Sequence, residues 1–309
     1  MWLQIMYVNA QNMADALKQN RQYRIYTHKN PDGDAIGTAY ALAAGMRSLG
    51  IRCAVYCSDP VPEPYRYMVE GAVNDEVSAD CPGIVVDLPS PGRLGKYEGA
   101  GIDYCIDHHE NNGFPDALVY ADEKASSCAE LMLQVLEAMG IVITREIANL
   151  LYVGLVTDTL CFRTWSTRTE TMKAAVRLAE YGADIAGIAR RHALIKTPQR
   201  MEIAGVLCRS FHYTCDRRVL GCMFTYDDMR RIGIDDSQLG GLNSIVEQVA
   251  GVDIGIVVRE TRPSHCRVSV RTGKGISAAE ICARLGGGGH ANAAGVEMEV
   301  RPAEALASV

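Results

Sequence analysis

Long apolar runs and targeting features are missing from this chain. No apolar stretch reaches membrane-spanning length, and no basic flank precedes the short apolar start at residues 1–6. We therefore expect neither a transmembrane helix nor a secretory signal peptide. The eleven cysteines include no C-x-x-C pair, and their odd number in a chain of 309 residues argues against a disulfide framework. Reduced thiols in a cytoplasmic protein are the expectation that follows.

Positive charge is also scarce. The 31 Lys and Arg residues are outnumbered by 37 Asp and Glu residues, which gives a net charge of −6. Such a chain gains little from general attraction to phosphates, so a long nucleic-acid duplex is not an expected partner. No low-complexity tract or long run of charge indicates a disordered tail. The length predicts two domains, each large enough to form its own core.

Short apolar segments alternate with helical patterns in the first part of the chain. The expected strands are residues 23–27, 53–57, 83–86 and 104–106, and the expected helices include 35–49, 127–139 and 144–158, with capping boxes at 127–130 and 167–170. This alternation predicts an α/β domain with a parallel sheet and helices on both faces. Beyond residue 210 the pattern changes to that of a smaller mixed α/β domain. We place the domains at residues 1–190 and 211–309, joined by a helical linker at 191–210.

Acids and histidines follow the apolar segments. After the successive segments come His28, Asp32, Asp34, Asp87, Asp107, His108, His109 and Asp158. Ligands of parallel sheets gather beyond the carboxyl ends of the strands, so we expect these segments to converge. A set of carboxylate and imidazole ligands without thiolate favours manganese, with magnesium as the alternative, over structural zinc.

The number of ligands indicates more than one ion. Six candidates are counted from His28, Asp32, Asp34, Asp87, His108 and Asp158. Six protein ligands exceed what one such ion needs, and they suit two divalent ions bridged by one carboxylate, which together activate water for phosphoester hydrolysis. Each piece alone is weak, because a His-His pair is often a surface feature and an Asp-Gly-Asp segment is often a solvated turn. The prediction depends on their conjunction.

The motifs resemble those of the DHH phosphoesterase family, whose naming motif stands here as Asp107-His108-His109. Residues 28–38 resemble the family's first motif, and residues 287–295 resemble the signature of its DHH-associated C-terminal domain. Size and domain order are similar to those of nanoRNA phosphodiesterases that also act on 3′-phosphoadenosine 5′-phosphate. The resemblance covers nearly the whole chain.

The resemblance also implies a role for each residue of the metal site. His28 and Asp32 would bind one metal, and Asp34, His108 and Asp158 the other, with Asp87 bridging. Asp107 would orient a ligand histidine, and His109 would face the phosphate. Arg93 falls at a family position, but the prolines on either side of Ser90 make its loop stiff, and we leave it outside the ligand set.

In the second domain, glycines free the backbone for close approach to a ligand. The resemblance and this argument together give five substrate-binding candidates: Arg271, Gly288, Gly289, His290 and Asn292. A flexible connector for the glycines and a solvated charge for Arg271 stay open as alternatives. We expect Trp165 to pack in the core rather than to stack on a base, and His192, His212 and His265 to be structural or surface residues.

The expected activity is metal-dependent hydrolysis of short substrates held across the interdomain cleft. These are dinucleotides such as pApA or pGpG, other short oligonucleotides, and 3′-phosphoadenosine 5′-phosphate. A cyclic dinucleotide phosphodiesterase and a RecJ-like exonuclease are alternatives, although the length and acidity disfavour the second. A family II pyrophosphatase is disfavoured by the second-domain signature, and a non-catalytic nucleotide or RNA binder predicts gaps in the ligand set that we do not see. The oligomeric state is open, with a homodimer among the options.

Overall fold

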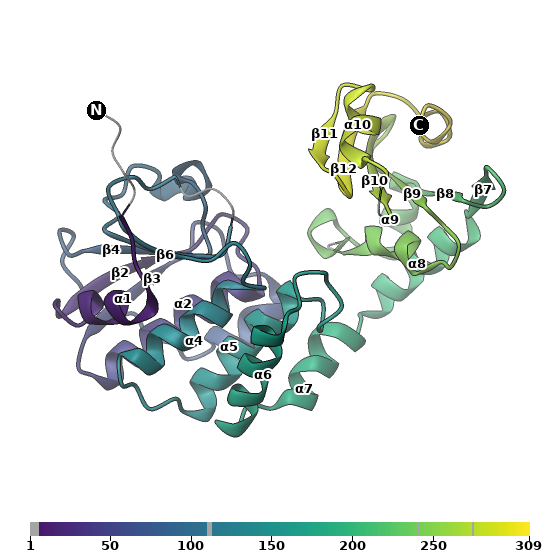
Figure 1. The fold of residues 1–309 in the computed structure, drawn as a ribbon. Coiled ribbons are helices and arrows are strands. Elements are labelled where there is room, and N and C mark those ends of the chain that lie inside the picture. The colour runs from purple at the N-terminus through teal and green to yellow at the C-terminus, as the bar shows by residue number, and fades with distance from the viewer. Residues whose placement is uncertain (1–5, 110–112, 240, 274) are drawn as a thin grey trace. The chain divides into compact units, whose positions relative to one another are not determined.

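Figure 1 shows the fold in a computed structural model, which describes residues 6–109, 113–239, 241–273 and 275–309. The chain divides into two compact units, Met1–Ile195 and Lys196–Val309, and the division falls inside the region where a helical linker is predicted. Within the described residues, no helix combines the length and the apolar character needed to cross a membrane.

A six-stranded sheet forms the centre of the first unit, and every pair of neighbouring strands is parallel. In sheet order the strands are β1 (Met6–Tyr7), β6 (Leu118–Ala121), β5 (Tyr104–Asp107), β4 (Gly83–Val86), β2 (Gln22–Tyr26) and β3 (Arg52–Tyr56). The predicted parallel α/β domain is confirmed. Strands β1 and β6 were not among the expected strands. From β2 the chain first passes to its neighbour β3 on one side, and then crosses back to β4 on the other side. The direction in which the chain winds across the sheet therefore changes between β2 and β4.

The two faces of this sheet are covered differently. The core on the first face combines sheet residues with residues of the helices α1 (Ala10–Leu17), α2 (Gly33–Ser48), α4 (Cys128–Ala138), α5 (Arg145–Asp158), α6 (Thr169–Glu180) and α7 (Ile185–Ala189). On the second face Leu88, Leu94 and Phe114 form a separate cluster with other residues of the sheet, next to the 3-10 turns η2 (Pro91–Arg93) and η3 (Gly95–Tyr97). Among the described residues, the helical segments on the second face are thus 3-10 turns rather than α-helices. The proline-rich connection from β4 to β5 forms 3-10 turns instead of a full helix.

Side-chain caps set where the helices begin. Asp32 is the N-cap of α2 and its Oδ1 accepts from the amides of Asp34 and Ala35, so the helix begins two residues before its predicted start. Ser127 caps α4 as predicted. The predicted box at 167–170 is displaced by one residue, because α6 (Thr169–Glu180) has Arg168 at its N-cap, whose amide donates to the Thr171 hydroxyl.

Helices α2 and α5 cross with almost no space between them. A Cβ at Gly37 would lie 2.3 Å from the Leu150 carbonyl oxygen, and a Cβ at Gly154 would lie 2.5 Å from Asp34 Oδ1. Contacts that short require glycine, because the atoms in the way are backbone and a buried carboxylate. The crossing therefore holds the start of α2, which carries Asp34, directly against α5, which ends at Asp158.

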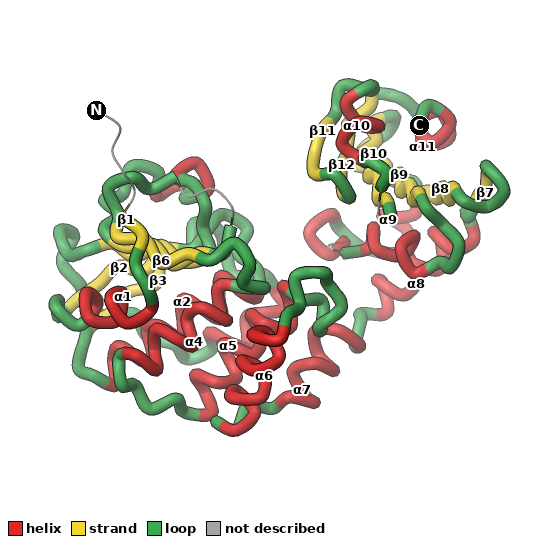
Figure 2. Tube along the Cα trace, in the orientation of Figure 1, coloured by secondary structure: helices red, strands yellow, loops and turns green. Residues whose placement is uncertain are grey.

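The second unit is a mixed sheet with short helices (Figure 2). Its strands in sheet order are β11 (Gly288–His290), β12 (Ala293–Met298), β10 (His265–Thr272), β9 (Ile254–Arg262), β8 (Val219–Phe224) and β7 (His212–Thr214), and its helices are α8 (Pro198–Arg209), α9 (Tyr226–Ile232), α10 (Ala278–Ala283) and α11 (Pro302–Ala307). The predicted mixed α/β class is confirmed. Between α9 and β9 lie two 3-10 turns, η5 (Asp236–Leu239) and η6 (Leu242–Gln248). Gly288 and Gly289, the last two of the four consecutive glycines at 286–289, lie in strand β11.

Replacing Gly37 with alanine should destabilise the first unit. The added methyl group would press on the carbonyl of Leu150, and overpacking of this kind costs about 1–3 kcal/mol. For a unit of this size, that cost corresponds to a fall of roughly 2–12 °C in the midpoint of thermal unfolding. Circular dichroism on heating measures it.

Gly101→Ala is the matched control, because nothing lies within 4 Å of a Cβ at that position. The close crossing would be contradicted if the Gly37 and Gly101 variants melted at the same temperature as the unmodified protein.

Candidate metal centre

The first sheet brings the predicted ligands to one edge. His28 follows β2, Asp87 follows β4, and Asp107 and His108 stand at the end of β5. These are neighbouring strands that flank the point where the chain changes direction across the sheet, which is where parallel sheets form ligand sites. Asp158 arrives differently, as the last residue of helix α5.

The ligand atoms fall into three overlapping clusters, in each of which all atoms lie within 4.8 Å of one another. The clusters are His28, Asp32 and Asp87; Asp34, His108 and Asp158; and Asp87, His108 and His109. All six predicted ligands are therefore brought together, and His109 lies beside them.

Asp87 connects the clusters. Its Oδ2 lies 3.4 Å from His28 Nε2, and its Oδ1 lies 3.3 Å from His108 Nε2. Oδ1 is buried and accepts no hydrogen bond within the described part of the chain, so a strong acceptor is left for another partner. The backbone of Asp87 has a φ of +53°, which is unusual for a residue other than glycine. Such strain is found where a side chain must be aimed at one place.

Each of three histidines is held in place through its own Nδ1 atom. The Nδ1 atoms of His28, His108 and His109 face the Lys29 carbonyl at 2.8 Å, the Ala125 carbonyl at 3.3 Å and Asp107 Oδ1 at 2.8 Å. Since each partner is an acceptor, Nδ1 carries the proton and donates. Nε2 of His28 and His108 is then the atom that faces the carboxylates, and in the neutral ring it has the lone pair that metal binding requires. Because Nδ1 of His28 carries its proton, it cannot accept a hydrogen bond from the Arg93 guanidinium, which lies 3.3 Å from it and only contacts the ring.

Asp34 is fully buried and is fixed by the start of helix α4. Its Oδ2 accepts from the Cys128 amide at 2.6 Å, and its Oδ1 accepts from the Ala129 amide at 2.9 Å and from the Thr38 hydroxyl at 3.2 Å. The N-terminus of a helix stabilises a carboxylate through its free amides and its dipole. Sequence reasoning found the Ser127 cap but did not show that the next two amides hold a ligand.

Asp107 supports His109 in particular. Its Oδ1 accepts from the His109 imidazole and from the His108 amide, at 2.8 and 2.9 Å. The His109 side chain is 35% exposed while that of Asp107 is fully buried, so the buried acid orients the more accessible ring. Its histidine partner is thus the one predicted to face phosphate.

The titration behaviour of the centre reflects closely packed negative charge. Burial and the charge of Asp87 raise the pKa of Asp34 to about 8, and burial and Asp34 raise the pKa of Asp158 well above its ordinary value. Burial would lower the pKa of His108, but the carboxylates of Asp87, Asp34 and Asp158 outweigh it and raise the pKa to about 10. The carboxylates thus favour positive charge where the Nε2 atoms lie. Divalent cations would supply that charge, and the oxygen and imidazole donors fit them.

The predicted substrate residues of the second unit share one end of its sheet. Arg271 on β10 stands opposite Ala293 of β12, and the Thr272 amide donates to the Asn292 carbonyl. Gly288, Gly289 and His290 form the edge strand β11, and Gly289 has a φ of +145° with no room for a Cβ against Ala294. The glycines are thus part of the sheet rather than a flexible connector.

The remaining residues considered in the sequence, Trp165 and three histidines, lie outside the metal centre. Trp165 was expected in the core, but its side chain is 99% exposed, because it stands in the turn between α5 and α6. His265 contacts Glu299 at the surface and His212 is exposed, as expected. His192 packs against Tyr65, which sequence reasoning did not single out.

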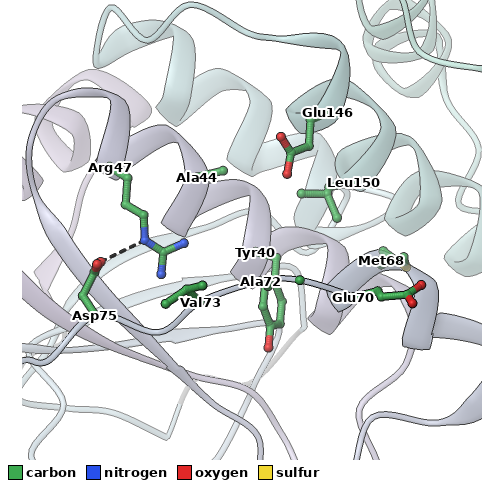
Figure 3. Close-up of a pocket in the computed structure, with 11 residues that line it drawn as sticks. Tyr40, Ala44, Arg47, Met68, Glu70, Ala72, Val73, Asp75, Glu146 and Leu150 are labelled. Atoms are coloured by element: carbon green, nitrogen blue, oxygen red, sulfur yellow. Dashed lines mark hydrogen bonds and ion pairs between the residues drawn. The ribbon is translucent and has the colours of Figure 1, made fainter.

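A cavity of about 280 Å³ lies elsewhere in the first unit, between α2, α5 and residues 68–75 (Figure 3). Its lining contains Tyr40, Glu70, Glu146 and the ion pair of Arg47 with Asp75 at 2.8 Å. It shares no residue with the three clusters, so it is not part of the metal centre.

Among known proteins, the bifunctional oligoribonuclease and PAP phosphatase NrnA of Thermus thermophilus is 29% identical over 281 residues, which cover 89% of this chain and 83% of that protein. A probable manganese-dependent inorganic pyrophosphatase of Streptococcus thermophilus is 26% identical over 183 residues, covering 51% and 57%. The crystal structure of an exopolyphosphatase-related protein from Bacteroides fragilis shares the fold, with a TM-score of 0.86 at 21% identity over 97% of this chain and 95% of that one.

Two family models match the chain. The N-terminal domain of the DHH family matches residues 22–155, and the DHHA1 domain matches residues 221–308. The predicted resemblance is confirmed in both parts of the chain. The chain belongs to the DHH family, with an N-terminal DHH domain followed by a DHHA1 domain.

Proposed function

We propose that this protein hydrolyses phosphoester bonds of short oligonucleotides with two divalent cations held in the first unit. The observation that carries the proposal is Asp87, whose two oxygens face histidines of two different clusters, as a bridging ligand does. Membership of the DHH family and the similarity to an oligoribonuclease and PAP phosphatase support the same reaction class. The proposed substrates are dinucleotides such as pApA and pGpG, and 3′-phosphoadenosine 5′-phosphate.

The clusters suggest how the ligands divide. We assign His28 and Asp32 to one cation, Asp34, His108 and Asp158 to the other, and Asp87 to both. When bound, such cations polarise a phosphoryl oxygen and acidify a water molecule. Manganese is the proposed ion, since a relative is named manganese-dependent and the donors are oxygen and imidazole. Magnesium offers the same chemistry and is the alternative.

His109 and the second unit complete the proposal. With Nδ1 of His109 bound to Asp107, its Nε2 is the atom left to contact the phosphate. Arg271, with the strand Gly288–His290 and Asn292, is assigned to substrate binding, because an arginine and exposed backbone amides recognise a terminal phosphate.

The alternatives are less well supported. The similarity to a pyrophosphatase covers about half of this chain, and the second part matches the DHHA1 domain. A non-catalytic binder predicts an incomplete ligand set, whereas all six candidates lie in the clusters. A cyclic dinucleotide phosphodiesterase shares the same centre and is separated only by assay. A RecJ-like exonuclease acting on long strands is disfavoured by the net charge of −6.

A substrate panel should rank these activities directly. In manganese buffer we expect turnover of pApA, pGpG and 3′-phosphoadenosine 5′-phosphate to exceed that of cyclic dinucleotides, long single strands and pyrophosphate. Chromatography of the products measures each rate. Addition of a chelator should abolish turnover, and faster hydrolysis of pyrophosphate or of a ring than of any linear dinucleotide would contradict the proposal.

Asp87→Asn and Asp107→Ala should fail in different ways. Loss of the bridging carboxylate should lower kcat by roughly 100- to 1,000-fold and remove the rise in melting temperature that manganese causes. Asp107 contacts His109 and the backbone, so its loss should lower kcat by roughly 10- to 100-fold while that rise is kept. Differential scanning fluorimetry and a pApA assay separate the two effects.

Asp80→Asn is the control for both variants, because Asp80 is an exposed acid outside the clusters. If manganese raised the melting temperature of the Asp87 variant as much as that of the unmodified protein, the assignment of Asp87 as the bridging ligand would be wrong.

Arg271→Gln should weaken substrate binding without slowing the chemical step. We expect KM for pApA to rise by roughly 10-fold or more with kcat nearly unchanged, since a charge-assisted hydrogen bond to phosphate is lost in both the ground and the transition state. Steady-state kinetics measure the two constants. Arg267→Gln, four residues away on the same strand, is the matched control. If both variants gave equal KM values, Arg271 would have no part in recognition.

A further inference from the structure

Tyr65 lies against the backbone between two of the predicted ligands. It ends the 3-10 turn η1 (Glu63–Tyr65), and a Cβ at Gly33 would lie 2.9 Å from its Cε1 atom. Gly33 separates Asp32 from Asp34, and the same Cβ would meet Thr157, the neighbour of Asp158. The tyrosine ring therefore contacts the first turn of α2 next to the metal centre, although the residue comes from a different loop.

A second layer of side chains fixes this ring. The imidazole of His192, in the π-helical turn η4 (Arg190–Leu194), stacks on Tyr65 with ring centroids 5.6 Å apart and planes at 13°. Its Nε2 lies 2.7 Å from the Tyr67 hydroxyl, and the Arg191 guanidinium lies over the Tyr67 ring at 3.6 Å. His192 and Arg191 both lie near the end of the first unit. A ring held on one face by a stack has little freedom to turn away from Gly33.

The surroundings keep the Tyr65 hydroxyl protonated. Burial raises its pKa, the negative charges of Asp32 and Asp158 raise it further, and the result is about 12. The hydroxyl is thus a hydrogen-bond donor at neutral pH, in a place where the nearby side chains are carboxylates. If those carboxylates hold cations, the remaining group that the hydroxyl can serve is an anionic ligand of the centre.

We propose that Tyr65 is a substrate-contacting residue whose hydroxyl donates a hydrogen bond to a phosphoryl oxygen at the metal centre, with His192 as its positioning residue. The proposal rests on the proposed function for the identity of the ligand. The contacts with Gly33 and His192 place the ring, and the carboxylates beside the hydroxyl keep it a donor. The Gly33 backbone also hydrogen-bonds to this hydroxyl, which opposes the rise of its pKa and places the hydroxyl beside the residue between Asp32 and Asp34.

Tyr65→Phe tests this directly, because phenylalanine keeps both ring contacts. We expect kcat/KM for pApA to fall by roughly 10- to 100-fold, as for loss of a hydrogen bond to a charged group. Affinity for the product-like probe adenosine 5′-monophosphate, measured by calorimetry in manganese buffer, should fall by roughly 10-fold. The melting temperature, and its rise with manganese, should stay unchanged.

Tyr40→Phe is the matched control. Tyr40 lies on α2 like Asp34, and burial also raises the pKa of its hydroxyl to about 12, but it lines the cavity of Figure 3. It should keep normal kinetics and normal nucleotide affinity. For the positioning residue, His192→Phe should retain the stack and most of the activity, whereas His192→Ala should reproduce part of the Tyr65→Phe defect.

The outcomes separate this inference from the proposed function. If the unmodified protein hydrolysed none of the panel but Tyr65→Phe still lost nucleotide affinity, the contact would stand and the reaction class would fall. If the unmodified protein were active and Tyr65→Phe matched it in kcat/KM and nucleotide affinity, the inference would be overturned. Loss of the manganese response in Tyr65→Phe would also overturn it, because the hydroxyl would then support the metal ligands.

Discussion

The position of Asp87 is the constraint on which the centre depends. One carboxylate, buried at the end of β4 with a left-handed backbone, presents its two oxygens to His28 on one side and His108 on the other. Strands β2 and β5 are the two neighbours of β4, so each histidine comes from a strand paired with the one that carries Asp87. The spacing of the clusters is therefore the spacing of three adjacent parallel strands, about 4.8 Å apart. A change in strand order would separate the ligands.

Burying several carboxylates close together costs free energy, because the charges lose their hydration and repel one another, and contacts from the surrounding fold offset this cost. Helix α4 gives two amides to Asp34, and carbonyl or carboxylate oxygens fix the Nδ1 atoms of three histidines. Gly154 leaves the space that the Asp34 carboxylate occupies. These contacts hold the donors in place before a cation binds, and such preorganisation reduces the free energy that ligand ordering takes from binding. Charge complementarity then favours divalent cations over neutral ligands.

Much of this could be read from the sequence, because strand ends of a parallel sheet meet at one edge. That rule brought His28, Asp87 and His108 together without knowledge of distances. It could not show that Asp107 pairs with His109, because an alternation of acid and histidine does not reveal which imidazole turns toward which oxygen. Trp165 was misplaced because tryptophan is buried in most proteins, whereas here helix α5 has already ended and the residue stands in the exposed turn that follows it. Tyr65 and His192 are 127 residues apart in sequence and no motif surrounds them, so only the folded chain reveals their contact.

The most direct test of the account is where the cations bind. Anomalous diffraction at the manganese edge, on crystals of the complete chain grown with manganese, locates every bound ion. We predict two peaks in the first unit, roughly 3.5–4 Å apart, with one oxygen of Asp87 in contact with each or one oxygen shared between them. A single peak, or two peaks of which one lacked Asp87 as a ligand, would contradict the account.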